Sequence, residues 1–168
     1  MIIGHGDIAS VLKDKENRVF FASGVSNSQE TRESEYQREI DLLMTMDRNR
    51  HIVYFGSLSI FYSDSRYAQH KRHMEELVKL NFKHYTIVRL GNISWGKNPN
   101  TIINFFYNKL KNNEPIEVRD VHRYIIDKEE FLHWVEMIPD WNVEMNITGL
   151  YLTINEIIEK YVNPRLNS

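Results

Sequence analysis

Short apolar runs alternate along this chain with longer segments whose apolar residues recur at helical spacing, and this alternation restricts the fold more than any other feature. The runs are rich in β-branched and aromatic residues and lie at 1–3, 18–22, 51–56 and 85–91. Most of them carry too few polar positions for a sheet with one face open to water. We therefore expect parallel strands that are buried on both faces.

The segments between these runs are expected to form helices that cover such a sheet. Helical periodicity is found at 7–14, 29–46, 66–81 and 99–112. Strands that alternate with helices indicate an α/β layer fold with right-handed crossovers. The sequence thus predicts a mostly parallel central sheet between two helical layers.

The C-terminal half carries weaker versions of the same signals. Short strands are expected near 116–118 and 144–148, and helices over 127–138 and 154–162, with an apolar segment "RYII" at 123–126. Asp127 and Thr153 are suitable N-caps for these two helices. No break rich in Pro, Gly or Ser divides the chain, so we expect a single domain over 1–168 with a loose tail after about 162.

Composition and charge argue against several classes of function. Twenty-one basic and 23 acidic side chains leave a formal charge of −2, which gives no overall attraction to nucleic acid or to an anionic membrane. Cysteine is absent, which excludes disulfides, thiolate zinc sites and a cysteine nucleophile. No leader segment is recognisable, and no apolar run approaches the roughly 18 residues of a membrane span. A soluble cytoplasmic protein is expected.

The first apolar run breaks into the turn Gly4-x-Gly6-x-x-Ala9. Two glycines permit a tight turn and the close approach of a pyrophosphate, and a small third residue allows a helix to pack on the strand. The same spacing also occurs in turns that bind nothing, so both interpretations stay open. The next run begins near Arg18 and ends without the carboxylate that normally holds the adenosine ribose of a dinucleotide. If a dinucleotide binds, other residues must contact its adenosine end.

A serine and a Tyr-x-x-x-Lys pair follow the central apolar run. Ser57 stands where that run ends, and ligands gather at the carboxyl ends of strands in open α/β sheets. Tyr67 and Lys71 lie four residues apart near the start of the next expected helix, on the same helix face. The same spacing recurs without such a serine at Tyr107 with Lys111 and at Tyr124 with Lys128. Context therefore favours the first pair.

These three residue types suit proton transfer. A free tyrosine titrates near pH 10, and service as an acid or base near neutrality needs a pKa lower by about 3 units, or about 4 kcal/mol of preferential stabilisation of the phenolate. The ammonium of Lys71 would supply that field, and Ser57 would hydrogen-bond the substrate oxygen. In the alternative interpretation, Tyr67 packs its ring, Lys71 lies in solvent and Ser57 satisfies a backbone group.

Six segments in this order resemble the extended short-chain dehydrogenase/reductase family of nucleotide-sugar epimerases, dehydratases and reductases. They are "GHGDIAS", "FASGVS", "YFGSLSIF", "YAQHK", "IVRLGNISWG" and "RYIID". The resemblance extends to about residue 160 and implies a Rossmann-like three-layer fold. It also implies NAD or NADP as cofactor, a nucleotide sugar as substrate, and a homodimer formed through helices 29–46 and 66–81.

The resemblance also assigns roles to single residues. Tyr67 is the expected acid and base, Lys71 assists it and holds the nicotinamide ribose, and Ser57 polarises the substrate oxygen. Further cofactor contacts are expected from Gly4, Gly6, Asp7, Ile8, Ala22 and Ser23. Substrate contacts are expected from Ser59, Asn92 and Arg123, the last two in a small substrate-side region at about 92–126.

The chain is shorter than members of that family. Two strands and a helix are missing between Leu12 and Arg18, and the loop between the serine and the tyrosine is cut to 58–66. Two hypotheses follow. The protein is an NAD(P)-dependent enzyme of nucleotide sugars, or it is a non-redox Rossmann-like nucleotide-binding module or pseudoenzyme that acts through a partner.

Four other features have alternative interpretations. His70 and His73 have a spacing that could bind a metal, but no third ligand is evident, so we expect surface histidines and no metal site. His5 could touch a phosphate or be a tolerated turn residue. Trp95 could stack on a base or close the core. The charged run 29–39 is expected to be the solvated face of a helix.

Overall fold

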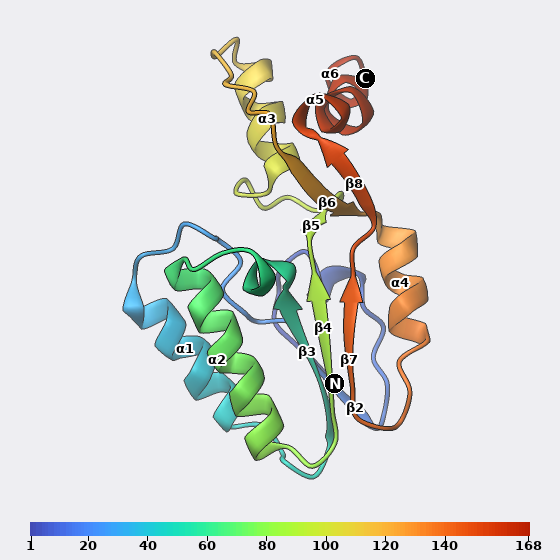
Figure 1. Cartoon of the computed structure of the whole chain (residues 1–168). Coiled ribbons are helices and arrows are strands. Elements are labelled where there is room, and N and C mark those ends of the chain that lie inside the picture. The colour runs from blue at the N-terminus through green and yellow to red at the C-terminus, as the bar shows by residue number, and fades with distance from the viewer.

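A five-stranded parallel sheet lies between helices, and a smaller lobe sits above the carboxyl ends of its strands in a computed structural model that describes all residues from 1 to 168 (Figure 1). Its strands, in spatial order, are β1 (Ile2–Ile3), β2 (Arg18–Phe21), β3 (His51–Ser57), β4 (Tyr85–Leu90) and β7 (Val143–Ile147). The expected Rossmann-like, mostly parallel three-layer fold is confirmed.

The central strands are apolar on both faces because each face has its own core. In β3, Ile52 and Tyr54 pack toward one helical layer, and Val53 and Phe55 pack toward the other. Successive side chains of a strand point to opposite faces, so an unbroken apolar run is what a strand between two helical layers requires. The lack of polar alternation in the sequence is explained by this double burial.

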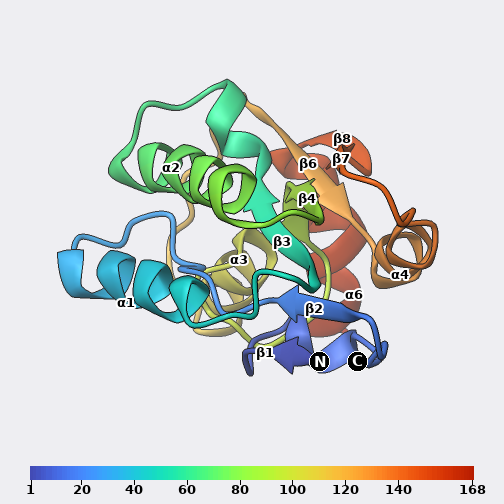
Figure 2. The same ribbon diagram turned by 90° about the horizontal axis from the view of Figure 1, so that it is seen from below.

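Helices α1 (Glu33–Met44) and α2 (Arg66–Asn81) cover one face of the sheet, and α4 (Lys128–Glu136) covers the other (Figure 2). The bounds of α2 are those predicted from the sequence. Helix α1 begins later than expected, because the Glu30 carboxylate accepts hydrogen bonds from the backbone amides of Thr31 and Arg32, and Arg32 keeps an extended backbone. Such local bonds compete with helix formation.

The first predicted helix is wrong. Residues 7–14 contain only a short 3₁₀ helix, Ala9–Val11. Strand β1 pairs directly with the next strand in the chain, with Ile2 opposite Phe20, and forms the edge of the sheet. The helical conformation ends at Leu12, which has an extended backbone and packs in the core with Phe20 and Val53.

The smaller lobe consists of a three-stranded sheet and several helices. Its elements are β5 (Asn92–Ile93), α3 (Ile102–Lys111), β6 (His122–Ile126), β8 (Leu150–Thr153), α5 (Ile154–Ile157), a π-helical turn (Ile158–Val162) and α6 (Asn163–Leu166). Two of its strands, β5 and β8, were not predicted, and the expected strand at 116–118 does not form. The lobe therefore draws on 150–166 as well as on the predicted region 92–126.

The ends of these helices differ from the expectations at two points. The Thr153 cap is confirmed, since its hydroxyl and the Glu156 carboxylate form a reciprocal capping box. Asp127 precedes α4, but its side chain makes no capping hydrogen bond. The residues after 162, expected as a loose tail, form a short helix in which Arg165 donates to the Ser94 carbonyl at 2.7 Å.

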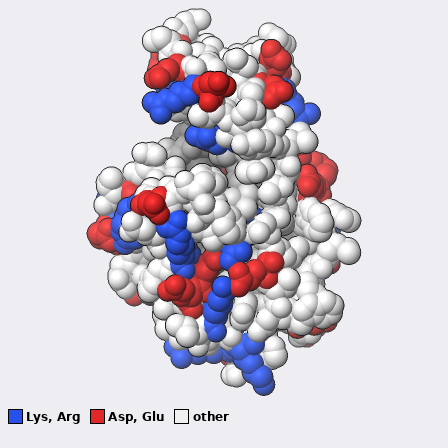
Figure 3. Space-filling model, in the orientation of Figure 1, with Lys and Arg blue, Asp and Glu red and all other residues white.

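The surface offers no large region of one charge on the face shown in Figure 3, where acidic and basic side chains are interspersed. None of the helices is both long and apolar enough to cross a membrane.

Candidate functional site

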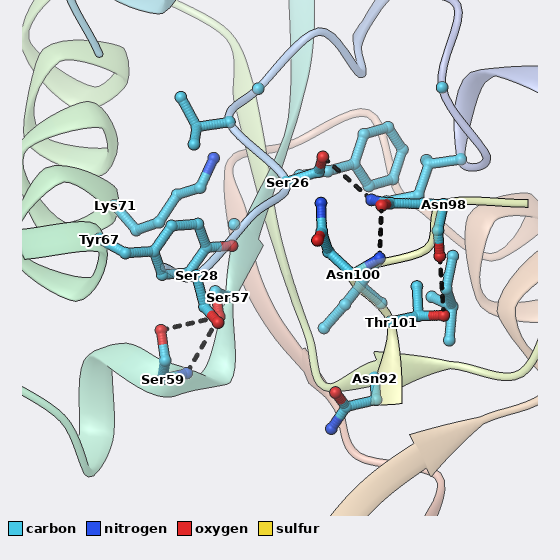
Figure 4. Close-up of a pocket in the computed structure, with 18 of the residues that line it drawn as sticks. Ser26, Ser28, Ser57, Ser59, Tyr67, Lys71, Asn92, Asn98, Asn100 and Thr101 are labelled. Atoms are coloured by element: carbon cyan, nitrogen blue, oxygen red, sulfur yellow. Dashed lines mark hydrogen bonds between the residues drawn. The ribbon is translucent and has the colours of Figure 1, made fainter. Parts of the chain in front are cut away.

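A cavity of about 860 Å³ lies between the carboxyl ends of the central strands and the smaller lobe. Figure 3 shows the molecule hollowed between these two parts, and Figure 4 shows the side chains within. Hydroxyl and amide groups predominate in its lining, among them Ser26, Ser28, Ser59, Asn92, Asn98 and Asn100. The cavity can thus offer many neutral hydrogen-bond donors and acceptors to a ligand.

The fold brings all but one of the residues singled out from the sequence to this cavity. The lining includes Gly6, Asp7, Ile8, Ala22, Ser23, Ser57, Ser59, Tyr67, Lys71, Asn92 and Arg123. Gly4 is the exception. It has a φ of +121°, and a β-carbon there would lie 2.3 Å from the Ala22 carbonyl oxygen. Its lack of a side chain serves the close approach of two strands, whereas Gly6 faces open space.

Ser57 and Tyr67 both line the cavity (Figure 4). The Ser57 hydroxyl donates to the Ser59 hydroxyl at 2.8 Å and accepts from the Ser59 backbone amide at 3.1 Å. Tyr67 lies in the first turn of α2, which Ser65 caps. Its ring lies between Lys71 and Ser57 in Figure 4, and its hydroxyl makes no hydrogen bond within the protein. That hydroxyl is available to a ligand.

Lys71 is buried in the wall, so the interpretation that it is solvated is wrong. Its ammonium lies 3.0 and 3.3 Å from the two carboxylate oxygens of Glu39 and 3.3 Å from the Tyr54 hydroxyl. It lies 5.5 Å from the centre of the Tyr67 ring. Only 3% of the side chain is exposed. Lys71 is therefore beside Tyr67, as the spacing predicted, but most of its donor capacity is used inside the protein.

Glu39 is the residue of the site that sequence reasoning missed. It ends the charged run 29–39, which was expected to be solvated, yet it is completely buried. Its carboxylate also accepts from the Val25 amide at 2.8 Å and from the Tyr54 hydroxyl at 2.9 Å. Its helical spacing from the apolar, buried Leu43 was the available signal, because residues four apart share one helix face.

His70 was expected at the surface and is also buried against Glu39. Its side chain is 1% exposed, and its Nε2 lies 2.9 Å from the Glu39 carboxylate. A carboxylate only accepts, so this nitrogen carries the proton. His73 is exposed, and no group of three His, Asp or Glu side chains is arranged to hold a metal ion.

The charges of this cluster stabilise each other. Burial disfavours the ionised form of Glu39, but the Lys71 charge and the hydrogen bonds from His70 and Val25 outweigh it and hold the pKa of the carboxyl well below its usual range. Burial likewise disfavours the Lys71 ammonium, but the Glu39 charge raises the pKa of Lys71 above its ordinary value. Burial and the Glu39 charge together raise the pKa of Tyr54.

The glycine turn is tied to the loop that follows β5. The Asp7 carboxylate accepts from the backbone amides of Lys97 at 3.0 Å and Asn98 at 2.9 Å. Its carbonyl accepts from the Trp95 indole at 3.0 Å, and the Trp95 ring packs on Phe131. Trp95 therefore closes the core. Asp7 lines the cavity, but its carboxylate is engaged within the chain and places negative charge beside the turn.

The cavity suits one end of a nicotinamide dinucleotide better than the other. Ala22, Ser23, Tyr67 and Lys71, expected to contact the cofactor, all line it. At the adenosine end, β2 ends without a carboxylate, the sheet stops at β1, and no full helix follows the glycine turn to offer its positive dipole end. The features that usually hold adenosine in this fold are therefore missing at that end.

A second cavity, of about 510 Å³, adjoins the smaller lobe. Its apolar wall includes Ile102, Phe105, Phe106, Pro115 and Ile154. Arg123 lines this cavity and the first one as well. One arginine therefore borders both a polar cavity and a partly aromatic one.

Comparisons with known proteins reveal similarity of structure only. No protein-family model matches the sequence, and no curated protein is detectably similar to it. A solved UDP-N-acetylglucosamine 4-epimerase from Methanobrevibacter ruminantium, in complex with UDP-N-acetylmuramic acid, is similar with a TM-score of 0.68 and 19% identity, over 91% of this chain and 61% of the other.

Two further solved structures carry a nicotinamide dinucleotide. The Bordetella bronchiseptica enzyme WbmG in complex with NAD and UDP has a TM-score of 0.64 at 14% identity, over 88% of this chain and 56% of the other. UDP-glucose 4-epimerase from Thermus thermophilus with NAD has a TM-score of 0.61 at 12% identity, over 90% and 62%. The chain thus has the fold of these three proteins and spans about three fifths of their length.

Proposed function

We propose that this protein is an enzyme of the NAD(P)-dependent epimerase, dehydratase or reductase type that acts on a nucleotide-linked sugar. The observation that carries the proposal is the free hydroxyl of Tyr67 in a cavity lined with hydroxyl and amide groups. A hydroxyl that the protein leaves without a hydrogen bond is available for proton transfer to a bound ligand.

The shape and chemistry of the two cavities support a nucleotide sugar as ligand. The first cavity offers the neutral donors and acceptors that sugar hydroxyls need. Arg123 lines both cavities and suits a diphosphate, because a guanidinium binds phosphate oxygens through paired hydrogen bonds. The aromatic wall of the second cavity, with Phe105 and Phe106, suits a base.

The proton chemistry would be divided between two side chains. Ser57 would hydrogen-bond one sugar hydroxyl, and Tyr67 would take the proton of that hydroxyl or return it. A nicotinamide cofactor, when bound, accepts or supplies the hydride that such a change of oxidation state requires. Ser59 and Asn92 would orient the sugar ring from opposite sides of the cavity.

Calorimetric titration with UDP-glucose, UDP and glucose tests the substrate class. We expect UDP-glucose to bind more tightly than UDP or glucose, since it occupies both cavities. Arg123→Ala should weaken the binding of UDP and of UDP-glucose by at least about tenfold and should leave the binding of glucose nearly unchanged. Arg48→Ala, an exposed arginine in the turn before β3, is the matched control. Absence of binding by all nucleotide sugars would contradict the proposal.

A second candidate is a binding module without redox chemistry. It is favoured by one observation: the sheet ends at β1, and β2 ends without the carboxylate that usually holds an adenosine ribose. Titration with NAD, NADH, NADP and NADPH separates the two. Binding of a nucleotide sugar without binding of any of these cofactors would support the module, and binding of both would support the enzyme. Pairing of two copies through α1 and α2 remains a prediction for light scattering.

A further inference from the structure

We propose that Glu39 is a positioning residue of the proton-transfer set, which fixes the Lys71 amine in the cavity wall and keeps it charged. The catalytic meaning of this inference rests on the proposed function. Its test requires neither substrate nor cofactor, so the two can fail separately.

The geometry assigns Glu39 this role because its carboxylate joins three elements of the site. It accepts hydrogen bonds from Lys71 and His70 of α2 and from the Tyr54 hydroxyl of β3. The backbone amide of Val25, in the loop after β2, completes the set. With all four contacts made, neither the carboxylate nor the ammonium can move without breaking several hydrogen bonds.

The loop after β2 also covers the pair. A β-carbon at Gly24 would lie 2.6 Å from the Lys71 nitrogen and 2.9 Å from a Glu39 oxygen. The ion pair therefore lies directly beneath backbone that lines the cavity. Only a residue without a side chain leaves room for the ammonium at this position.

Glu39 is the carboxylate that lies within hydrogen-bond distance of Lys71. The next buried carboxylate on α2, that of Glu75, is paired with Arg89. The groups around the amine are Glu39 and Tyr36 on α1, Tyr54 on β3, and Tyr67 and His70 on α2. The loop residues 22–26 contribute only backbone and small side chains. A buried amine without a negative partner loses its proton, because burial penalises the charged form. Without Glu39, we therefore expect a neutral, nucleophilic Lys71.

Two consequences follow for the proposed chemistry. The ammonium is held beside the Tyr67 ring, 5.5 Å from its centre, and does not project into the cavity. The negative charge of Glu39 also cancels part of the field of the Lys71 ammonium. The electric field at the Tyr67 hydroxyl is therefore weaker than that of an isolated cation. Glu39 thus sets both the position and the effective charge of Lys71.

Reductive methylation with formaldehyde and a borohydride, followed by mass spectrometry of the Lys71 peptide, tests this inference. The reaction requires the neutral amine. We expect Lys71 in Glu39→Gln to react at pH 7 at least about ten times faster than in the wild type. Each unit by which the pKa of an amine falls raises its unprotonated fraction about tenfold. Glu33→Gln removes an exposed carboxylate of the same helix, paired with Arg66, and should leave the Lys71 rate unchanged.

Equal rates for Lys71 in Glu39→Gln and the wild type would overturn the inference, and so would an equal acceleration in Glu33→Gln. Circular dichroism establishes whether Glu39→Gln is folded. If it is not, NMR of the wild type with isotope-labelled lysine decides. Lys71 should then remain an ammonium as the pH passes the ordinary lysine value of 10.5, and loss of its proton below that pH would overturn the inference. UDP-glucose titration of the same samples reports separately on the proposed function.

Discussion

The Lys71 amine lies 3.0 Å from Glu39, and the two side chains are 3% and 0% exposed. Breaking a buried ion pair by removing one partner leaves an uncompensated charge, which costs about 3–5 kcal/mol. We expect Glu39→Gln and Lys71→Met each to lower the free energy of unfolding by about that amount in urea titrations. The double variant should lose much less than the sum of the two. Additive losses would contradict a coupled pair.

The pH dependence of stability follows from the same pair. Glu39 has a lowered pKa in the folded state, so its contribution is present above about its unfolded value of 4.5 and is lost as the pH falls toward the folded value. Lys71 has a raised pKa, so its contribution is present below its unfolded value of 10.5 and is lost as the pH rises through the folded value.

The difference in melting temperature between the wild type and Glu39→Gln should therefore be largest between about pH 5 and 10 and should shrink in acid. Melting curves recorded across this range provide the measurement. A difference that stays constant down to pH 2 would show that the ionisation of Glu39 is not its source.

Tyr67 and Tyr54 provide a contrast between function and structure. The Tyr67 hydroxyl has no partner in the protein, so Tyr67→Phe should change stability by no more than about 0.5 kcal/mol while abolishing turnover. The Tyr54 hydroxyl donates to Glu39 at 2.9 Å, so Tyr54→Phe should destabilise the fold by about 1–3 kcal/mol. Thermal melts of both variants, with turnover of nucleotide sugars for the first, test this. Unchanged turnover in Tyr67→Phe would rule out the proposed acid and base.

The two glycines of the first turn should respond differently to alanine. Gly4 combines a φ of +121° with a β-carbon position 2.3 Å from the Ala22 carbonyl oxygen, so Gly4→Ala should destabilise by more than about 1–3 kcal/mol. Gly6 has a negative φ and open space around it, so Gly6→Ala should fold normally.

A ligand that approaches the backbone at Gly6 would nevertheless meet the added methyl group. Titration of Gly6→Ala with NAD and with UDP-glucose therefore reports which of them passes this turn. Weakened NAD binding with unchanged UDP-glucose binding would place a cofactor phosphate at the turn. Unchanged binding of both would remove the turn from the site.

Much of the fold could be predicted because it depends on local patterns. Helix α2 has the bounds that its apolar periodicity indicated, and the Thr153 cap acts within one turn of chain. Ser57 was placed at the cavity for a similar reason, since the ends of parallel strands meet at one edge of a sheet. Asn92 and Arg123 were named only through the resemblance to a known family. The helix expected at 7–14 failed because the chain becomes extended at Leu12, which packs in the core.

Spacing along the chain was enough to place strands β2, β3 and β4 and helix α2, to show that the sheet is apolar on both faces, and to put Ser57 and Tyr67 at its carboxyl edge. The burial of Glu39 and His70, in contrast, depends on tertiary contacts. Their polarity predicts exposure, and their partners lie 32 and 31 residues away along the chain. Folding brings α1 against α2, and a charge can be removed from water there because its counter-charge arrives with it.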